Sequence, residues 1–564
     1  MHPAGPVGPA SLAPRSAVVV IVGVGVVLVV LPVARLVQTV LDEGAGSFGQ
    51  IVSSPGLATA VTNTLVLGVV VTAIAVPAGT LIAVALHHAD VPAKSGWRIA
   101  VLLPVVVPQF VLGYSWTQAY GRAGFTDTAL GLHWDGVLGP VGVVVVLVVN
   151  MVPLTYLFAA VGLATRAESN LERAARASGA STTTVIRTVV LPLLRPSIAA
   201  AAVLSFVLTL ESFAIPQVMG APAGFTTVTT KIYADLSLGS DPFSFVEAVA
   251  LALLLVVITV IVVAPADALL GPRLRVDRLA HSEGAPTAGT ARSTGRWIAA
   301  GLAGYLVFSV VLPLIALVAA AVTRAIGLPP TPDNWTLDNF RMVLDQRTYE
   351  ALGRTLVLAA VAASLLVVLG GCVAALERRR SGRAVASLIT LTLVLPGSTL
   401  AVALLIAYGE WIGGSLGLIL MAYLAKLWAF AHRPISGALG RLPADEMHAA
   451  RASGATSLTA IRTVVLRPLA PALLGAWLIC FTTALHEITM SSLLYGPGTE
   501  TLAVVVLNSQ ELGRIGTTSA LSVLLTLLMV VLALPVWMVI RWLSAPHRTR
   551  AQPSAEPNAP ARVC

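Results

Sequence analysis

Two short polar blocks of nearly the same sequence interrupt the apolar runs of this chain. One reads ERAARASGA from Glu172 and the other reads MHAARASGA from Met447, and both continue into IRTVVL. Equivalent residues lie 275 positions apart throughout, as Ala174 and Ala449 do. Arginine holds a partner through charge and through several N–H donors at once. A block of this kind written twice is most simply two copies of one docking surface.

The local sequence of each block predicts a helix, a turn and a second helix. In the first copy Leu171, Ala174, Ala175 and Ser178 share one helical face, and the small residues on it allow another protein to approach closely. Gly179 can take the left-handed conformation that ends a helix. An ordinary amphipathic connector would explain one such loop, but it explains two near-identical loops poorly.

Three ionisable side chains stand near the ends of apolar runs, where burial is costly. They are Glu211, His486 and Glu487, and the offset of 275 pairs His486 with Glu211. They could line a pathway that favours a cationic cargo, or they could pair with neighbouring helices and cap helix ends. His486 and Glu487 diverge by about 100° on a helix and make a poor chelate.

Composition predicts an all-α polytopic membrane protein. Apolar residues make up 57% of the chain and charged residues 11%, and the apolar runs reach the length of about 20 residues that spans a bilayer. The net charge of +9 comes from basic loops between these runs, so we expect no nucleic-acid partner. The three cysteines give no metal-ligand spacing and no disulfide framework, so we predict no metal site and no cofactor on this chain.

The apolar runs predict about twelve spans in two six-span halves. Arginines concentrate in alternate loops, which places those loops and both termini in the cytoplasm; the loop 324–350, with both signs of charge, is an exception. The first apolar run is longer than a typical signal core, so we expect it to stay as a span. The predicted spans are residues 17–39, 61–86, 98–118, 141–163, 197–217, 246–270, 297–323, 351–376, 385–408, 415–432, 472–494 and 517–543.

Four domains follow from this pattern. The first six-span half covers residues 1–270 and the second covers 297–543. Between them, residues 271–296 are polar and rich in Gly, Ala, Ser and Thr, which is typical of a flexible cytoplasmic linker. Residues 544–564 read as a disordered cytoplasmic tail.

The doubled block resembles the cytoplasmic loop of permease subunits of bacterial ABC importers. That loop has the pattern EAA, three residues, G, and then an LP pair after a gap. Two positions depart from the pattern: Arg173 and His448 stand where the acid is expected, and Arg467 replaces the proline of the second LP pair. The resemblance covers nearly the whole chain and implies the type I importer fold in the bacterial inner membrane. The residues it places in the docking loops are Glu172, Ala174, Ala175, Arg176, Gly179, Glu446, Ala449, Ala450, Arg451 and Gly454.

The same resemblance implies the partners. In that family the loop seats in a groove of the ATP-hydrolysing subunit, and an extracytoplasmic binding protein delivers the cargo. None of the three lysines of this chain lies in a phosphate-binding G-x-x-x-x-G-K-[ST] loop, so we expect ATP hydrolysis by a separate subunit, present in two copies, and no enzyme activity here.

The cargo is inferred from the resemblance alone. The segment from Leu210 to Leu236 is similar to ferric-type permeases, which implies ferric iron, with thiamine, a polyamine or a phosphonate as alternatives. The competing classes are a membrane-embedded enzyme, for which the sequence shows no convergent cluster of His, Asp or Ser residues, and a secondary transporter. It would also show a repeat, but it would have no reason to duplicate a docking loop.

Overall fold

The computed structural model describes residues 15–42, 54–166, 169–239, 241–274, 292–377, 392, 395–442 and 444–544. These residues form helices and connecting loops, with two isolated β-bridges, at Thr323–Trp335 and Gly414–Tyr495. The predicted all-α class is therefore confirmed. Most of the predicted linker 271–296 and the predicted tail from 545 onward lie outside the described residues.

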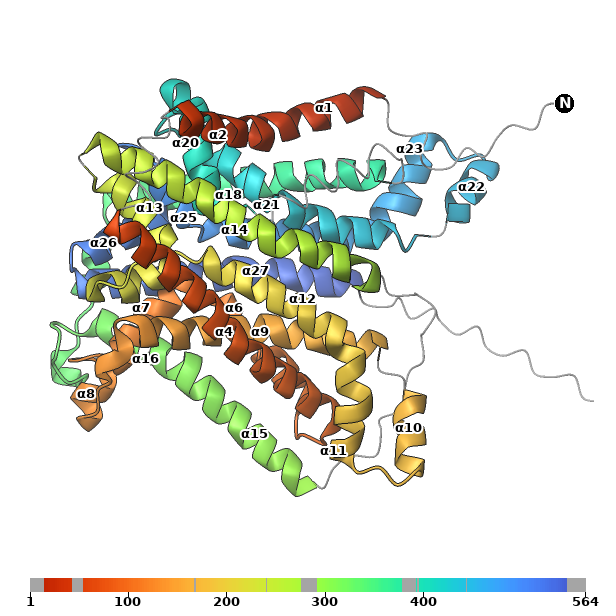
Figure 1. Cartoon of the computed structure of the whole chain (residues 1–564), viewed down its shortest axis with the longest axis horizontal. Helices are drawn as coiled ribbons and strands as arrows, with labels where there is room; N and C mark the ends of the chain where they lie inside the picture. The colour runs from red at the N-terminus through yellow and green to blue at the C-terminus, as the bar shows by residue number, and fades with distance from the viewer. Residues whose placement is uncertain are drawn as a thin grey trace, which may run out of the picture.

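The long helices follow one another in the same order in the two halves, whereas the short helices differ (Figure 1). The first half contains α1 (Arg15–Gly25), α2 (Leu31–Asp42), α4 (Pro55–His88), α5 (Lys94–Ala100), α6 (Leu103–Val106), α7 (Gln109–Tyr120), α8 (Phe125–Leu130), α9 (Pro140–Arg166), α10 (Ser169–Ala177), α11 (Thr182–Val185), α12 (Leu191–Leu210), α13 (Val228–Ser237) and α14 (Pro242–Leu274). The second contains α15 (Arg292–Leu306), α16 (Leu312–Val322), α17 (Asp338–Val343), α18 (Gln346–Leu376), α20 (Gly397–Ile412), α21 (Leu416–Leu439), α22 (Ala444–Ala452), α23 (Ser457–Ala460), α24 (Arg467–Leu485), α25 (Thr489–Leu494), α26 (Leu502–Glu511) and α27 (Ile515–Ser544).

Each half has the same three-helix centre. In the first half α4, α9 and α12 pack against one another, and in the second half α18, α21 and α24 do the same. The approach of α4 to α9 depends on Gly79, because a Cβ there would clash with the Thr155 hydroxyl and the nearby backbone of α9. The Thr155 hydroxyl in turn donates to the Ala75 carbonyl of α4 at 2.8 Å, so both contacts hold the two helices close.

The number of clear spans is lower than the twelve predicted. Nine helical stretches in the described residues are long and apolar enough to cross a bilayer, or ten if one bent pair counts as one span. The bent pair is the predicted span 98–118, which breaks by 93° between Val106 and Gln109, where Pro108 intervenes. The helix α21 is long enough but carries Lys426 and is not one of the nine. Part of the predicted span 385–408 lies outside the described residues.

Two predicted spans are placed too late in the sequence. The span predicted at 197–217 is a continuous helix from Thr182 to Leu210, and the one predicted at 472–494 runs from Leu458 to Leu485. In both, the apolar run continues past the end of the helix, and the helix begins inside the polar repeat. A prediction from hydropathy alone therefore placed the start and the end of both spans too late in the sequence.

The first membrane-spanning helix of each half, Val19–Asp42 and Thr294–Val322, packs against the opposite half. The helix α16 of the second half lies against α7, and α2 of the first half lies against α20. The hydrophobic core accordingly continues across both halves and includes Trp116, Val310, Leu28 and Leu404. The two halves are thus interlocked rather than merely adjacent.

Five π-helical turns occur in the described residues, and four of them lie at matching places in the two halves, each ending two residues before a proline. They are Val26–Val30 before Pro32, Ile186–Val190 before Pro192, Val307–Val311 before Pro313, and Ile461–Leu466 before Pro468. A proline within a helix lacks the N–H that would bond to the carbonyl four residues earlier, and its ring clashes with that carbonyl. Widening the turn to the π pattern relieves the clash and leaves carbonyl groups available to other donors.

Aromatic residues of the opposite half satisfy some of these carbonyls. The Tyr120 hydroxyl donates to the Phe308 carbonyl at 2.5 Å, and the Tyr408 hydroxyl donates to the Val27 carbonyl at 2.7 Å. The Trp116 indole donates to the Ser309 carbonyl at 3.0 Å. Phe308 and Val27 each stand five residues before the proline of their π turn, so Tyr120 and Tyr408 make the same contact in the two halves.

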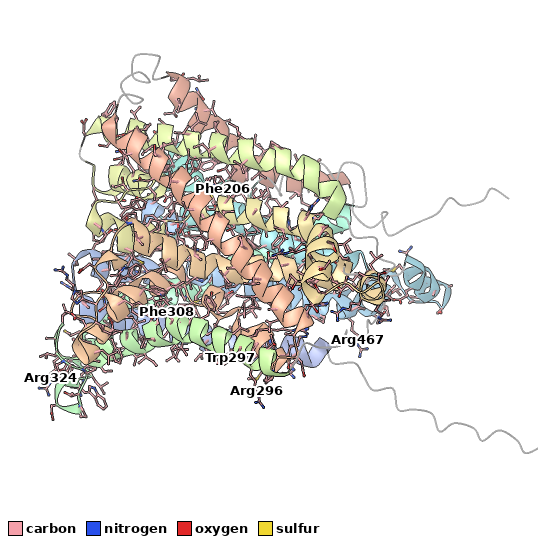
Figure 2. All side chains as sticks on the ribbon, turned by 60° about the horizontal axis from the view of Figure 1, so that its bottom comes forward. Phe206, Arg296, Trp297, Phe308, Arg324 and Arg467 are labelled. Carbon is pink, nitrogen blue, oxygen red and sulfur yellow. The ribbon has the colours of Figure 1, made fainter. Side chains whose placement is uncertain are left out.

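The polar loops and short helices lie at the two ends of the molecule's long axis. Figure 1 shows α10, α11, α22 and α23 at one end, together with the beginning of α1, while α8, α13 and α26 lie at the other. In Figure 2, Arg296 and Arg467 lie toward the end that carries α10 and α22, Arg324 lies at the opposite end, and Phe206 and Phe308 lie between them. The repeated loops therefore share one end of the bundle.

Candidate functional site

The first repeated loop is a helix, a glycine turn and a second helix, as the sequence predicted. The helix α10 ends at Ala177, and Gly179 follows with a φ of +84°. The Ala180 N–H donates to the Ala175 carbonyl at 3.1 Å, the bond that closes a glycine-capped helix end. Ser181 then caps α11 by accepting from the Thr184 N–H at 3.2 Å.

The second loop has the same conformation. The helix α22 ends at Ala452, Gly454 has a φ of +85°, and the Ala455 N–H donates to the Ala450 carbonyl at 3.0 Å. A Cβ at Gly179 or at Gly454 would meet no atom within 4 Å. Glycine is favoured at both places by the backbone conformation and not by crowding.

The two loops present small and basic residues at the surface. In α10, Leu171 is 45% exposed and Ala174 is exposed, while Ala175 and Arg176 are half-buried. In α22 the equivalents follow the same pattern: Ala449 and Glu446 are exposed, and Ala450 and Arg451 are half-buried.

Glu172 is the exception among the predicted docking residues. Its side chain is buried, with a relative exposure of 2%, and one carboxylate oxygen lies 3.3 Å from Nε2 of His88, at the end of α4. The position 275 residues later is Met447, which is also buried. In this conformation the place of Glu172 on α10 turns its side chain toward α4, and its predicted part in docking stays a prediction.

The predicted pathway acid Glu211 is paired across the two halves. Its carboxylate lies 2.6 Å from Nζ of Lys426, which also donates to the Leu395 carbonyl at 2.8 Å. Both side chains are nearly buried, at 10% and 12% exposure. Glu211 follows the last residue of α12, and Lys426 lies within α21 of the other half. The structure thus supports the pairing alternative for Glu211 and identifies a partner for Lys426.

His486 and Glu487 bond locally. The His486 ring nitrogen Nδ1 lies 2.6 Å from the Thr482 carbonyl, one turn earlier. The Glu487 carboxylate accepts from the N–H groups of Met490 at 3.0 Å and Ser491 at 3.1 Å, at the start of α25. Both carboxylates proposed as pathway groups therefore have partners, and Glu487 acts as a helix cap.

Polar contacts also join the halves at the end opposite the loops. The Glu511 carboxylate accepts from the Gln217 amide at 3.1 Å and the Tyr233 hydroxyl at 3.3 Å. Burial raises the pKa of Glu511. Within the first half, Lys231 lies 3.2 Å from Asp235 and 3.1 Å from Glu247. Sequence reasoning missed the contacts of Glu511 because Gln217 and Tyr233 lie 294 and 278 residues away from it in the chain.

Two cavities open at this same end. The larger, of about 510 Å³, lies between α7, α26 and the start of α27, and Arg122, Asp135 and Arg514 are its charged lining residues. Arg122 and Asp135 pair at 2.7 Å, and the Arg122 hydrogen bond lowers the pKa of Asp135. The smaller, of about 260 Å³, lies beside Arg324. Neither cavity is lined by Glu211, His486 or Glu487.

The structure is a bundle of membrane helices made of two similar halves, and each half presents the same loop motif at one end. This arrangement is typical of a permease-type protein. Residues 75–276 and 366–546 each match the family described as "Binding-protein-dependent transport system inner membrane component". The chain belongs to this family, and it carries the family's domain twice.

Relatives from the curated proteins agree with this family. The chain is 26% identical to the probable ABC transporter permease protein y4fN of Sinorhizobium fredii, over 75% of this chain and 77% of that protein. It is 23% identical to the ferric transport system permease protein FbpB of Actinobacillus pleuropneumoniae, over 78% of this chain and 65% of that protein. It is 26% identical to the putative 2-aminoethylphosphonate transport system permease protein PhnV of Salmonella choleraesuis, over 38% of this chain and 82% of that protein.

The family and the apolar helices together make this chain a multi-pass inner-membrane component of an ABC transporter. Its relatives carry different cargo names, so the family does not fix the cargo.

Proposed function

We propose that this chain forms the whole translocation pathway of an ABC importer and couples it to a separate ATPase through its two repeated loops. The observation that carries the proposal is the matched pair of glycine-capped loops, α10–α11 and α22–α23, at one end of the bundle. Two equal loops suit two copies of an ATPase subunit. ATP is bound by that partner, and the chain itself takes no part in hydrolysis.

The proposed orientation follows from the loops and the basic residues. The end that carries α10 and α22 also carries Arg296 and Arg467 and the start of α1 (Figure 2). The positive-inside rule favours the cytoplasm for this end, where ATP and its hydrolysing subunits are found. The cavities beside Arg324 and Arg514 then face the extracytoplasmic binding protein.

The contacts between the halves support a closed state of the pathway in this conformation. The Glu211–Lys426 pair lies within the bundle and the Glu511 contacts lie at the outer end, and each pair joins one half to the other. Transport requires the two halves to separate at one end and then at the other. Both contacts are therefore candidates for bonds that break and re-form during a transport cycle.

Ferric iron is the proposed cargo, since the match to FbpB covers both halves. A phosphonate is the second candidate, because the larger outer cavity has two arginines and only one acid, which favours an anion. A bare trivalent cation would meet repulsion there, so iron would need to arrive with oxygen ligands that carry negative charge.

Reconstitution with the cognate ATPase and binding protein tests the proposal. The chain alone, in lipid nanodiscs, should hydrolyse no ATP, and hydrolysis should begin when the ATPase is added. Hydrolysis by the chain alone, or failure of the two proteins to co-purify, would overturn the coupling proposal. In proteoliposomes, uptake of radiolabelled iron without uptake of 2-aminoethylphosphonate supports the ferric assignment, and the reverse result replaces it.

A further inference from the structure

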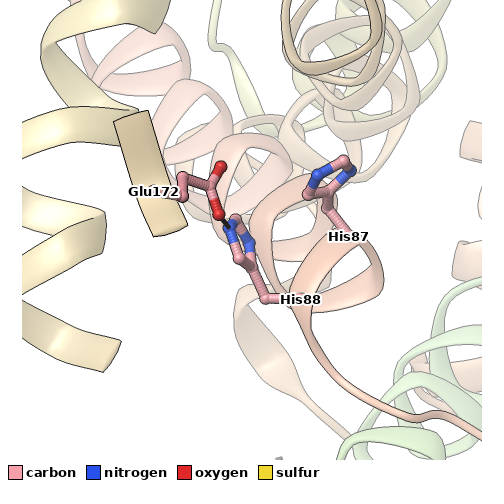
Figure 3. A group of neighbouring side chains, drawn as sticks. All are labelled: His87, His88 and Glu172. Carbon is pink, nitrogen blue, oxygen red and sulfur yellow. Dashed lines mark hydrogen bonds and ion pairs between the residues drawn. The ribbon is translucent and has the colours of Figure 1, made fainter. Parts of the chain in front are cut away.

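His87, His88 and Glu172 meet at the point where the first docking helix touches α4. His87 and His88 form the last turn of α4, and Glu172 faces them from α10 (Figure 3). One possible ligand atom from each residue lies within 4.8 Å of the others, and the two imidazole ring centroids are 4.8 Å apart. We propose that these three side chains bind a divalent transition-metal ion such as Zn²⁺, held between α4 and α10.

The hydrogen bonds of His88 support a ligand in this position. Its Nδ1 lies 3.1 Å from the Val84 carbonyl, which can only accept, so Nδ1 carries a hydrogen. Its Nε2 faces the Glu172 carboxylate at 3.3 Å. A neutral imidazole would place a lone pair against a negative oxygen, so either a second proton or a metal ion must lie between the two atoms. A ring nitrogen oriented by a backbone carbonyl is the usual arrangement of a metal-binding histidine.

The distances suit a small tetrahedral ion. Zinc binds histidine nitrogen at about 2.0–2.1 Å and carboxylate oxygen at about 2.0–2.2 Å, which places neighbouring ligand atoms about 3.4 Å apart. The observed 3.3 Å between His88 and Glu172 matches that edge. His87 and His88 are neighbours on α4 and diverge by about 100°. A ligand atom of the half-buried His87 nevertheless lies within 4.8 Å of those of His88 and Glu172, so His87 must rotate toward the ion in order to bind it. Three protein ligands leave a fourth position for water.

The second half shows that the loop does not need this acid in order to fold. Met447 stands at the position of Glu172 and is buried in the same way, at 8% exposure. The exposed acid of the second loop, Glu446, is one residue earlier. A buried carboxylate is costly unless it is paired, so its presence in one loop, opposite two histidines, indicates a role that the other loop lacks.

Nearby charge moderates the expected affinity. Lys94 donates to the His87 carbonyl at 2.9 Å and to the Ala89 carbonyl at 3.3 Å, so a positive charge stands close to the ligands. The ion should therefore bind reversibly. When bound, it would fix α10 to the end of α4 and so set the position of the first docking helix. This consequence rests on the proposed function of the loop, whereas the metal site itself does not.

The direct test uses the full chain, alone, in nanodiscs and with an affinity tag that contains no histidine. After treatment with EDTA, calorimetric titration with ZnCl₂ should give one ion per chain. Glu172→Met, which copies the other loop, and His88→Ala should each weaken binding by at least about tenfold, the lower end of the loss seen for outer-shell changes. Glu446→Gln and His432→Asn are the matched controls and should bind zinc as the unmodified chain does.

Two further readouts decide the outcome. Co²⁺ should give the intense visible absorption of a four-coordinate ion, and Zn²⁺ should slow amide exchange in α10 but not in α22. If Glu172→Met binds zinc as tightly as the unmodified chain does, or if Co²⁺ gives the weak spectrum of a six-coordinate ion, the metal-site proposal is overturned. If zinc binds but the ATPase does not co-purify, only the docking proposal fails. If the ATPase co-purifies and zinc does not bind, only the metal site fails.

Discussion

The ammonium nitrogen of Lys426 lies 2.6 Å from a carboxylate oxygen of Glu211, and the two residues belong to opposite halves of the molecule. Glu211 follows the last residue of α12, and Lys426 lies in the middle of α21. Opposite charges that are nearly buried in this way attract strongly, but each has lost its hydration. The pair therefore specifies how the halves meet more than it adds to stability.

The first prediction follows from that balance. Glu211→Gln and Lys426→Met should each destabilise the protein, with Lys426→Met, which leaves an unpaired buried carboxylate, costing about 3–5 kcal/mol. The double variant Glu211→Gln/Lys426→Met should recover most of the loss, because no charge is then left buried. Unfolding followed by tryptophan fluorescence in detergent measures all three.

An exposed ion pair gives the control for this cycle. Arg341 and Asp338 lie 3.1 Å apart with side chains 78% and 66% exposed, so Arg341→Gln should leave the unfolding curve unchanged. A double variant that is less stable than either single variant would show that the pair contributes net stability, contrary to this prediction.

The second prediction concerns the interlocked first helices. Tyr120→Phe and Tyr408→Phe each remove the hydroxyl that bonds to a carbonyl of a π turn in the opposite half. Each change should cost about 1 kcal/mol, the typical net value of one hydrogen bond. The two sites lie at equivalent places in different halves, so their effects should add. Thermal unfolding measures the sum, and Tyr349→Phe, at a tyrosine 54% exposed, is the control. A double variant as stable as the unmodified chain would contradict the prediction.

Local features could be predicted from the sequence because their causes are local. The left-handed conformations of Gly179 and Gly454 follow from a glycine after a run of helix-forming residues. The span predicted at 141–163 corresponds to a helix at Pro140–Arg166, since apolar residues fill it and polar residues bound it. Gln109 and Asn150, polar residues of two neighbouring helices, bond to each other at 3.1 Å, which is the usual arrangement for such residues between membrane helices.

Features that depend on distant parts of the chain could not be predicted. Lys426 and Glu211 are 215 residues apart and His88 and Glu172 are 84 apart, so no spacing rule connects them. The ends of the span predicted at 197–217 were misplaced because apolar residues continue beyond Glu211, while the helix itself ends at Leu210. The packing of the first membrane-spanning helix of each half against the opposite half cannot be read from hydropathy, because hydropathy does not say which helices are neighbours.

The third prediction is topological. A cysteine placed at Asp127 should react with a membrane-impermeant maleimide on intact cells, and a cysteine at Arg173 should react only after the cells are opened. The two positions lie near opposite ends of the bundle, one in α8 and the other in α10. The background must lack Cys372, Cys480 and Cys564. Labelling of Arg173→Cys on intact cells would reverse the orientation and, with it, the docking proposal.

The last prediction tests the loops themselves. Gly179→Val and Gly454→Val should each weaken co-purification of the ATPase, because a β-branched residue strongly resists a positive φ. The strain is of the order of 1–2 kcal/mol and acts only on the turn, since a Cβ meets no neighbour within 4 Å at either glycine. Gly179→Asn should retain more binding than Gly179→Val, because asparagine tolerates this conformation better than other residues.

A glycine in an ordinary helical conformation provides the matched control. Gly437, in α21, also has open space around its Cβ position, and its φ is not positive, so Gly437→Val should leave co-purification unchanged. Insertion in the membrane, judged by yield and by elution as a single species, should be the same for all four variants. If both valine variants at the loop glycines capture the ATPase as well as the unmodified chain does, the repeated loops are not the docking elements. If only one of them loses binding, the two loops contribute unequally, as the different residues at Glu172 and Met447 would allow.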